Sequence, residues 1–391
     1  MKLILVSLGS LGDIIPAIKL CKLLNDHQIR VSLIGYSVFK AFAIQNGIDY
    51  HGVCSEAEYN EMVSLSGNLE NYEADLHHFT SCAQFSIESV FHLVERLSVD
   101  EKVMVFTLGY CDGAIWACES SNIPMARLSY SPYDLDNPNA NACDEELNSK
   151  FESDCLVIKN KFRKKLGLTA LPIKAQLSTY LATICMYPSN FSKKSTAKHN
   201  GELIFLGFPE MNIAMDDSAS SIVLDAEIGY TTGSAFSATT TEIGNFERLC
   251  LILNKSGLFI ASNVAVRISN GKRENVIGRI DLRKALAGAE LVLHHGGIGT
   301  IADAINVRVP QVILPRAFDQ FYNARLIEEM SLGKTLDLAK FIKEDGDIEA
   351  VAELCREVIA SGEEVENISL SIEQAFESNS TLDLLDLIHN S

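Results

Sequence analysis

A glycine-rich segment in the second half of the chain has the residue types that bind phosphate. Residues 294–300 read His-His-Gly-Gly-Ile-Gly-Thr and stand between a predicted strand and a predicted helix. Glycines let the backbone approach a ligand closely, and the N–H groups that open a helix lie unpaired at the positive end of its dipole. The Thr300 hydroxyl and a histidine ring can add donors to diphosphate oxygens. The same residues also fit a helix cap, with Thr300 as N-cap and Asp303 three residues later, and the two roles are compatible.

A carboxylate and a carboxamide stand side by side after the next predicted strand. The segment reads Phe318-Asp319-Gln320. The two side chains offer acceptors and a donor that suit the paired hydroxyls of a sugar. The alternative is that Asp319 only caps a helix that begins near Tyr322.

A third candidate lies at the first strand-to-helix turn, where residues 9–13 read Gly-Ser-Leu-Gly-Asp. Asp13 is a candidate general base, since a positioned carboxylate can take a proton from a reacting hydroxyl. It is equally a candidate N-cap of the helix that follows.

Several common sites are excluded by spacing. The glycines at 9 and 12 and at 296, 297 and 299 do not form GxGxxG, and the second predicted strand ends in Ile34-Gly35-Tyr36 without the acid that grips a ribose. The GxxxxGK[ST], GxSxG and HExxH patterns are absent. The ten cysteines form no CxxC pair and no Cys/His cluster at zinc spacing, so we expect reduced thiols packed as small hydrophobes.

Short apolar runs alternate with helical runs, which is typical of parallel α/β architecture. In the middle, residues 132–150 carry two prolines and several asparagines, a composition that predicts a loop. The basic run at 159–165 predicts a solvated helix face, or alternatively a contact with an acidic acceptor or lipid head group. Predicted strands are Leu3–Val6, Val31–Ile34 and Val103–Leu108, and predicted helices span about Ile14–Asn25, 38–46, Phe79–Leu97 and Gly113–Ser120.

A second α/β pattern follows residues 208–221, which read as an exposed linker. Its predicted strands are Ile228–Tyr230, Leu291–His294 and Val312–Leu314, and residues 347–391 are predicted to be helical. Two halves that each open with a strand and a Gly/Ser turn predict two doubly wound domains facing one another. Ligands of such sheets bind at the carboxyl ends of the strands, so we expect the site in the cleft between the domains.

Length and charge narrow the classes of protein. The 391 residues suggest two or three domains at roughly 100–200 residues each. The net charge of −18 argues against nucleic acid as a main partner and disfavours docking on anionic lipid. No apolar run approaches the length of a membrane span, and the run Leu3–Val6 ends too soon for a secretory signal. We therefore expect a cytoplasmic protein whose first apolar run is a buried strand.

Taken together, these motifs resemble the family 1 glycosyltransferases, most closely the bacterial branch of natural-product and sterol-type glucosyltransferases. The resemblance rests on the GSxGD…P turn at 9–16, the HHGGxGT turn and the following DQ. Further matches span nearly the whole chain: Asn160, Arg163, Gly167 and Leu168 in an N-x-x-R-x-x-x-G-L segment, Leu206 to Pro209, Tyr230 to Ser234, and Asn323-Ala324 after DQ.

The resemblance implies a GT-B fold, with two Rossmann-like domains facing across a cleft. An acceptor-binding domain would span 1–210, a nucleotide-sugar-binding domain 222–370, and a C-terminal helix, 371–391, would cross back to the first domain. Asp13 falls on the family's catalytic base, His295 on its diphosphate-binding histidine, and Asp319 and Gln320 on its sugar-hydroxyl pair. The implied donor-binding residues are Ser10, Gly12, Ser234, Ile280, His295, Gly297, Ile298, Gly299, Thr300, Asp319 and Gln320.

The chain departs from the family pattern at three points. Arg308 stands before Val309-Pro310 where the family usually has glycine, and Asp281 stands where proline is common. There is no clear second acid to partner Asp13, and Asp112 is the candidate relay.

The resemblance further implies an inverting enzyme that moves a hexosyl group from a UDP- or TDP-sugar to a hydroxyl of a small, partly hydrophobic acceptor. No DxD-type carboxylate pair is placed for a divalent cation, so we expect neither a metal nor a cofactor, with the nucleotide-sugar as co-substrate. Two alternatives remain. One is another GT-B enzyme, such as a nucleotide-sugar epimerase or a lipid-linked sugar transferase, and the other is a catalytically silent nucleotide-sugar-binding accessory protein.

Overall fold

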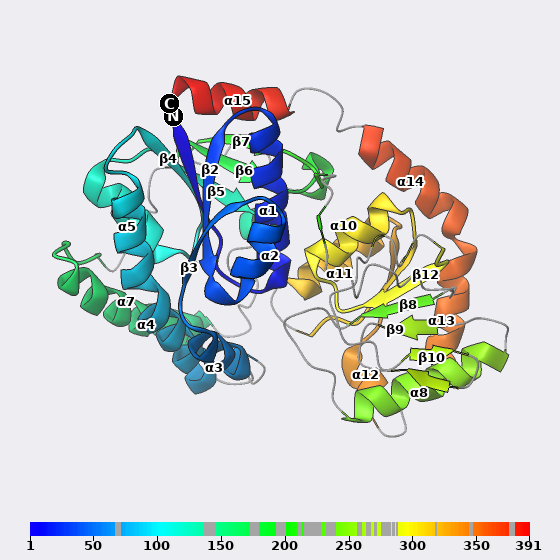
Figure 1. The fold of residues 1–391 in the computed structure, drawn as a ribbon. Coiled ribbons are helices and arrows are strands. Elements are labelled where there is room, and N and C mark those ends of the chain that lie inside the picture. The colour runs from blue at the N-terminus through cyan, green and yellow to red at the C-terminus, as the bar shows by residue number, and fades with distance from the viewer. Residues whose placement is uncertain are drawn as a thin grey trace. The chain divides into compact units, whose positions relative to one another are not determined.

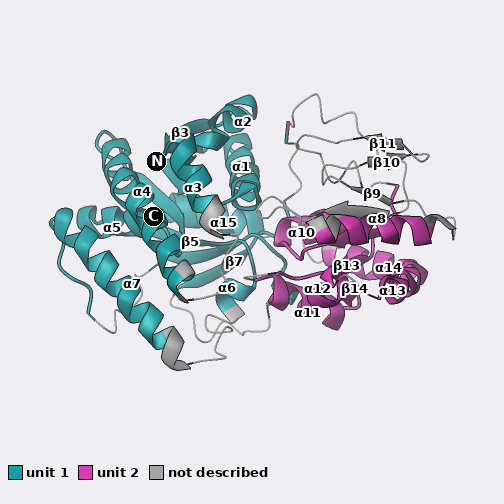
Figure 2. Cartoon of the chain, turned by 90° about the horizontal axis from the view of Figure 1, so that it is seen from below, with its two compact units in different colours: residues 1–213, 378–391 teal, residues 214–377 magenta. Residues whose placement is uncertain are grey.

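The computed structural model divides the chain into two compact units (Figure 2). Unit 1 comprises residues 1–213 and 378–391, and unit 2 comprises residues 214–377. Unit 2 is therefore an insertion in unit 1. The structure describes residues 1–66, 72–136, 145–172, 180–192, 201–209, 213–214, 228–231, 240–255, 260–262, 267–269, 272–274, 283, 286, 288–316, 319–343, 347–374 and 380–391.

Unit 1 is built on a seven-stranded sheet in the order β3-β2-β1-β4-β5-β6-β7, and every pairing is parallel (Figure 1). Parallel strands covered on both faces are apolar throughout, which explains the apolar runs in the sequence. The three strands predicted in this half are confirmed within β1, β2 and β4. The strands are β1 (Lys2–Val6), β2 (Arg30–Tyr36), β3 (Asp49–Val53), β4 (Val103–Leu108), β5 (Met125–Ser129), β6 (Ala182–Cys185) and β7 (Glu202–Phe205).

The order of this sheet places two distant loops side by side. β1 pairs with β4 so that Val6 lies opposite Thr107, although the two strands are far apart in sequence. The turn after β1, which leads to Asp13, and the turn after β4, which leads to Asp112, therefore leave the sheet at the same edge.

The helices of unit 1 correct two expectations. The first helix begins three residues earlier than predicted, because Ser10 and not Asp13 is its N-cap. The segment 132–150 is not simply a loop, since it contains α6 and the start of α7. The helices are α1 (Leu11–Asp26), η1 (Ser37–Phe39), α2 (Lys40–Gln45), α3 (Glu56–Ser66), α4 (Tyr72–Leu97), α5 (Asp112–Ser121), α6 (Tyr133–Asp136), α7 (Glu145–Lys165), η2 (Ser189–Phe191) and α15 (Ser380–Asn390).

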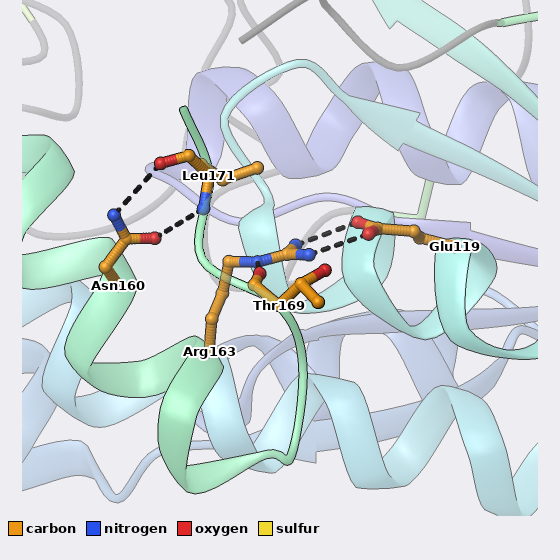
Figure 3. Close-up of polar contacts among 5 residues, drawn as sticks. All are labelled: Glu119, Asn160, Arg163, Thr169 and Leu171. Atoms are coloured by element: carbon orange, nitrogen blue, oxygen red, sulfur yellow. Dashed lines mark hydrogen bonds and ion pairs between the residues drawn. The ribbon is translucent and has the colours of Figure 1, made fainter. Parts of the chain in front are cut away.

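The basic run of α7 is not a uniformly solvated face. Arg163 is only 1% exposed, and its guanidinium donates to both carboxylate oxygens of Glu119, at 2.7 and 2.8 Å, and to the Thr169 carbonyl at 2.6 Å (Figure 3). Its charge also lies over the Trp116 ring, 5.2 Å from the centroid. Lys159 and Lys165 pair with acids on α5 and α4. The run therefore anchors α7 to its neighbouring helices.

The asparagine of the same motif holds the chain that leaves α7. The Asn160 amide donates to the Leu171 carbonyl at 3.2 Å, and its carbonyl oxygen accepts from the Leu171 N–H at 2.7 Å (Figure 3). The N-x-x-R segment thus fixes the path of residues 169–171 rather than contributing free donors to a site.

Unit 2 contains a five-stranded parallel sheet in the order β14-β13-β12-β8-β9 and a separate antiparallel pair, β10 and β11. The strands predicted at Ile228–Tyr230 and Leu291–His294 are confirmed by β8 and β12, and the one predicted at Val312–Leu314 is confirmed by β13, which begins and ends one residue earlier. The strands are β8 (Ile228–Thr231), β9 (Ile260–Ser262), β10 (Arg267–Ser269), β11 (Lys272–Glu274), β12 (Leu291–His294), β13 (Gln311–Ile313) and β14 (Gly333–Thr335).

The core of unit 2 lies between this sheet and its helices. Leu293 of β12 and Val312 of β13 pack in one buried cluster with Leu249, Phe341 and Val351. Because β12 and β13 are neighbours, with His294 opposite Ile313, the segments that follow them emerge together. The helices are α8 (Thr240–Lys255), α10 (Ile298–Asn306), α11 (Gln320–Glu329), α12 (Leu338–Ile342), α13 (Ile348–Ala360) and α14 (Gly362–Gln374).

The division of the chain falls after residue 213, inside the expected linker, and again after residue 377. The helix α14 continues to Gln374 within unit 2, packed on α10 and α13, so the returning segment starts later than the expected residue 371. That segment contains α15, which packs on β7 and buries Leu384 and Ile388. None of the helices in the described ranges is long and apolar enough to cross a bilayer.

Candidate functional site

The first candidate site is the start of α1. The Ser10 hydroxyl accepts from the Gly12 N–H at 3.1 Å, while the Asp13 carboxylate accepts from the Ser10 N–H at 2.8 Å through Oδ2. These reciprocal bonds are a capping box, with Asp13 at the third helical position. Gly9, at φ +145°, makes room for it, because a Cβ there would lie 2.2 Å from Asp13 Oδ2. The carboxylate is therefore folded back over the turn and held in place.

Two buried hydroxyl groups form a chain of hydrogen bonds to the backbone of this turn. Ser7 Oγ donates to the Asp13 carbonyl at 3.0 Å, and the Tyr130 hydroxyl donates to Ser7 Oγ at 3.1 Å. Ser7 and Tyr130 are buried at the ends of β1 and β5. The position of Asp13 thus depends on three segments of unit 1, namely the start of α1 and the residues that follow β1 and β5.

The partner that the β4–α5 turn brings to Asp13 is Tyr110. Its hydroxyl lies 3.2 Å from Asp13 Oδ1 and 3.0 Å from the Leu8 carbonyl. The expected relay, Asp112, instead binds the Lys159 ammonium, with both carboxylate oxygens 3.0 Å from Nζ. Burial raises the pKa of Asp112, and the charge of Lys159 opposes that shift. A hydrogen bond to Asp13 from this turn thus comes from Tyr110, while the relay role of Asp112 stays a prediction.

The second candidate site begins with the turn after β12, where the two histidines have different environments. His294 is buried; its Nδ1 accepts from the Gly296 N–H at 3.1 Å, so its Nε2 carries the hydrogen donated to Gln311 Oε1 at 3.0 Å. Burial lowers the pKa of His294 to about 3, so the ring stays neutral. His294 therefore shapes the turn from inside the unit, while His295 is partly exposed.

Two glycines make this turn possible. Gly296 has φ +90°, and a Cβ there would lie 2.7 Å from Ile313 Cγ2. A Cβ at Gly297 would lie 2.4 Å from His295 Nε2. The imidazole of His295 thus lies directly over the backbone of the turn.

The helix α10 starts immediately afterwards. Its N-cap is Gly297, without a side-chain cap, so the expected N-cap at Thr300 is wrong and Thr300 is the third helical residue. The first bond from a helical N–H to the cap runs from Ile301 to the Gly297 carbonyl, at 3.1 Å. The amides of Ile298, Gly299 and Thr300 precede that bond, at the helix end where anions bind.

The acid–amide pair lies at the start of α11. Asp319 occupies the N-cap position of a helix that begins at Gln320 rather than near Tyr322, and its side chain does not cap it. Gln320 is buried, and its Oε1 accepts from the Arg316 N–H at 2.8 Å. Gln320 therefore shapes the loop after β13.

A residue without a predicted role joins this pair to the glycine turn. Asn323 Nδ2 donates to the Gly296 carbonyl at 3.0 Å and to Asp319 Oδ2 at 2.8 Å. The structure thereby brings together Asp319, Gly296 and the start of α10. The four-residue spacing of Asp319 and Asn323 on one helix is a readable signal for their contact, but the bond to Gly296 is not readable from spacing.

Two predicted donor contacts, Ser234 and Ile280, lie outside the described residues, as does Asp281. Among the residues that the structure describes, no group of three or more His, Cys, Asp or Glu side chains is arranged to hold a metal ion. The described part of the predicted donor region thus consists of a backbone turn, a histidine, the start of a helix and a carboxylate.

Part of this region is similar to known proteins. Residues 267–370 match the family described as erythromycin biosynthesis protein CIII-like, C-terminal domain. A zeaxanthin glucosyltransferase of Pantoea ananas is 39% identical over 67 residues, 17% of this chain and 16% of its own. An O-mycaminosyltylonolide 6-deoxyallosyltransferase of Streptomyces fradiae is 33% identical over 102 residues, 23% of this chain and 24% of its own. The matched parts are thus less than a third of either relative.

Solved structures match over the full length. The glycotransferase of kitacinnamycin superposes with a TM-score of 0.74 at 13% identity, over 100% of this chain and 98% of its own. The spinosyn rhamnosyltransferase SpnG, complexed with thymidine diphosphate, superposes with a TM-score of 0.62 at 16% identity, over 99% of this chain and 100% of its own. At these identities the likeness concerns the fold, and that fold is GT-B. Residues 267–370 therefore match the CIII-like C-terminal domain family, and the chain as a whole has the GT-B fold.

Proposed function

We propose that this protein is an inverting glycosyltransferase that moves a hexosyl group from a UDP- or TDP-sugar to a hydroxyl of a small, partly hydrophobic acceptor. The observation that carries the proposal is the arrangement in unit 2. His295, the start of α10 and Asp319 are assembled around one turn, through Asn323 and the glycines. Donors for a diphosphate next to an acceptor for sugar hydroxyls are what a nucleotide-sugar requires.

In this proposal unit 2 stabilises the leaving group. Negative charge grows on the diphosphate as the bond to the anomeric carbon breaks. That charge would be stabilised by hydrogen bonds donated from the N–H groups of Ile298 to Thr300, the Thr300 hydroxyl and the ring of His295. Thymidine diphosphate complexes of two proteins of this fold, SpnG and SsfS6, support TDP as a donor nucleotide.

Unit 1 supplies the base. Asp13 accepts the proton of the acceptor hydroxyl as its oxygen attacks the anomeric carbon, and the nucleoside diphosphate leaves from the opposite face. Such assistance contributes roughly 10²–10⁴-fold. The Ser10 N–H, bound to Asp13 Oδ2 at 2.8 Å, fixes the direction of the carboxylate.

Two experiments test the proposal. A thermal-shift screen of UDP, TDP and their sugars should identify the donor, because a ligand at 100 times its dissociation constant stabilises by about 2.7 kcal/mol. With that donor, Asp13→Asn should bind nucleotide normally and lose about 10²-fold or more in transfer. Full transfer by Asp13→Asn would remove Asp13 as the base.

The same assays separate the alternatives and the remaining parts of the proposal. Sugar products formed from donor alone would indicate an epimerase, and binding without turnover across many acceptors would indicate an accessory protein. The anomeric configuration of the product, read by NMR, tests inversion. The proposal includes a cytoplasmic location, tested by cell fractionation, and independence of metal, which predicts unchanged rates in a chelator.

A further inference from the structure

The hydroxyl of Tyr110 lies between two acceptors of different kinds. Its oxygen is 3.2 Å from Asp13 Oδ1 and 3.0 Å from the carbonyl oxygen of Leu8. Tyr110 follows β4 and Leu8 follows β1, and these strands are neighbours in the sheet. The position of the hydroxyl is therefore set by the sheet itself.

A phenol has one hydrogen and can also accept a hydrogen bond, so Tyr110 can donate to only one of the two oxygens at a time. Loss of solvent around the hydroxyl, followed by the charge of Asp13, raises the pKa of Tyr110 well above its ordinary value. Tyr110 thus keeps its hydrogen throughout the range in which an enzyme works. With Asp13 ionised, the carboxylate is the stronger acceptor, because bonds to charged groups are stronger than neutral ones.

We propose that Tyr110 is a positioning residue that holds Asp13 in both of its protonation states. When Asp13 is a carboxylate, Tyr110 donates to Oδ1. When Asp13 has taken the acceptor's proton and carries it on Oδ1, the Tyr110 hydrogen turns to the Leu8 carbonyl, and the Tyr110 oxygen accepts from Asp13. No proton passes through Tyr110, and Asp13 keeps a partner before and after the transfer. This inference rests on the proposed role of Asp13 as base.

The environment of the ring separates this role from simple packing. Tyr110 is 58% exposed, whereas its hydroxyl lies against Leu8 and Asp13. Tyr110→Phe keeps the ring and removes only the hydroxyl, so the variant should fold as the parent does. Tyr50→Phe is a matched control, since it removes a hydroxyl of unit 1 that donates to the Tyr36 carbonyl at 2.7 Å.

The test is steady-state kinetics on the full chain with the donor found in the screen. Tyr110→Phe should lower kcat about 10- to 100-fold, the rate equivalent of one hydrogen bond to a charged group, with little change in either KM. Tyr50→Phe should keep kcat. Because Tyr110 acts through Asp13, the double variant Asp13→Asn/Tyr110→Phe should be no slower than Asp13→Asn alone.

The outcomes distinguish this inference from the proposed function. If Asp13→Asn loses transfer while Tyr110→Phe keeps the parental kcat, Tyr110 has no positioning role and Asp13 remains the base. A double variant whose loss is the product of the two single losses would also overturn the inference, because Tyr110 would then act independently of Asp13. If Asp13→Asn keeps full activity, the base assignment and this inference both fail.

Discussion

Asn323 donates to the Asp319 carboxylate at 2.8 Å from a position that is only 1% exposed, and the same nitrogen donates to the Gly296 carbonyl at 3.0 Å. One amide thus links the Asp319 carboxylate to the turn at Gly296, the two groups proposed to bind the sugar and the diphosphate. Loss of one partner in a buried bond costs about 1–3 kcal/mol. Asn323→Ala should therefore weaken binding of the nucleotide-sugar about 10-fold or more, measured by calorimetry.

The matched control for Asn323 is Asn245, another buried asparagine of unit 2, whose Nδ2 donates to the carbonyls of Phe341 and Lys343. Asn245→Ala should lower the melting temperature to a similar extent and leave donor affinity unchanged. Equal affinities in the two variants would mean that Asn323 contributes only to stability.

Gly297→Ala should displace the ring of His295. A Cβ at this position would lie 2.4 Å from Nε2, which forces the ring to move. If His295 binds the diphosphate, the affinity for the free nucleotide should fall about 10- to 100-fold, the equivalent of a hydrogen bond to a charged group. Gly244→Ala in α8 is the control, because a Cβ there meets nothing within 4 Å and should stabilise by roughly 0.5–1 kcal/mol. Unchanged nucleotide binding in Gly297→Ala would exclude His295 as a ligand.

His294 should make unit 2 less stable in mild acid. Its pKa is about 3 in the folded chain, against an ordinary value of 6.5. Below pH 6.5 the residue is therefore protonated in the unfolded chain while it stays neutral in the folded chain. The contribution of neutral His294 to the free energy of unfolding is complete above pH 6.5. It decreases as the pH falls, by about 2 kcal/mol at about pH 5. Urea midpoints of the parent and of His294→Leu should show this part of the pH dependence in the parent only. Parallel pH curves for the two proteins would contradict the prediction.

Arg308→Gly should stabilise the protein. Arg308 follows the C-cap of α10 with φ +61°, and its neighbour Val309 donates to the Ala304 carbonyl, which is the usual end of a helix that stops at glycine. A side chain in this conformation costs about 1 kcal/mol, which glycine would recover. Arg308→Ala keeps the Cβ and should show no gain in urea unfolding. A loss of stability in Arg308→Gly would mean that contacts of the arginine outweigh the strain.

Arg308, which stands where the family pattern usually has glycine, illustrates how much of the backbone conformation could be predicted from the sequence. Glycine was the expected residue there, and the backbone does adopt the left-handed conformation that glycine favours. The strands and their alternation with helices were predictable because a short run of apolar residues indicates a buried strand. Helix starts were less predictable: Ser10 and Gly297 are the N-caps, whereas the carboxylate of Asp13 and the hydroxyl of Thr300 stand three residues further on.

The contacts that assemble the sites depended on strand order, which no local pattern contains. Tyr110 meets Asp13 across 97 residues because β4 lies beside β1. Asn323 reaches Gly296 because β13 lies beside β12. In the same way the burial of Arg163 could not be predicted from the basic run in which it lies, because its partner Glu119 is on another helix.

The place of α15 in the chain, after the whole of unit 2, has a consequence for folding during synthesis. α15 packs on β7 and its residues Leu384 and Ile388 are buried, yet it is translated after the whole of unit 2. Domains generally fold as they leave the ribosome, N-terminal first. Here the surface of β7 that α15 covers stays exposed until residues 380–391 have been translated, so a ribosome that stalls inside unit 2 would release a chain whose first sheet lacks this helix.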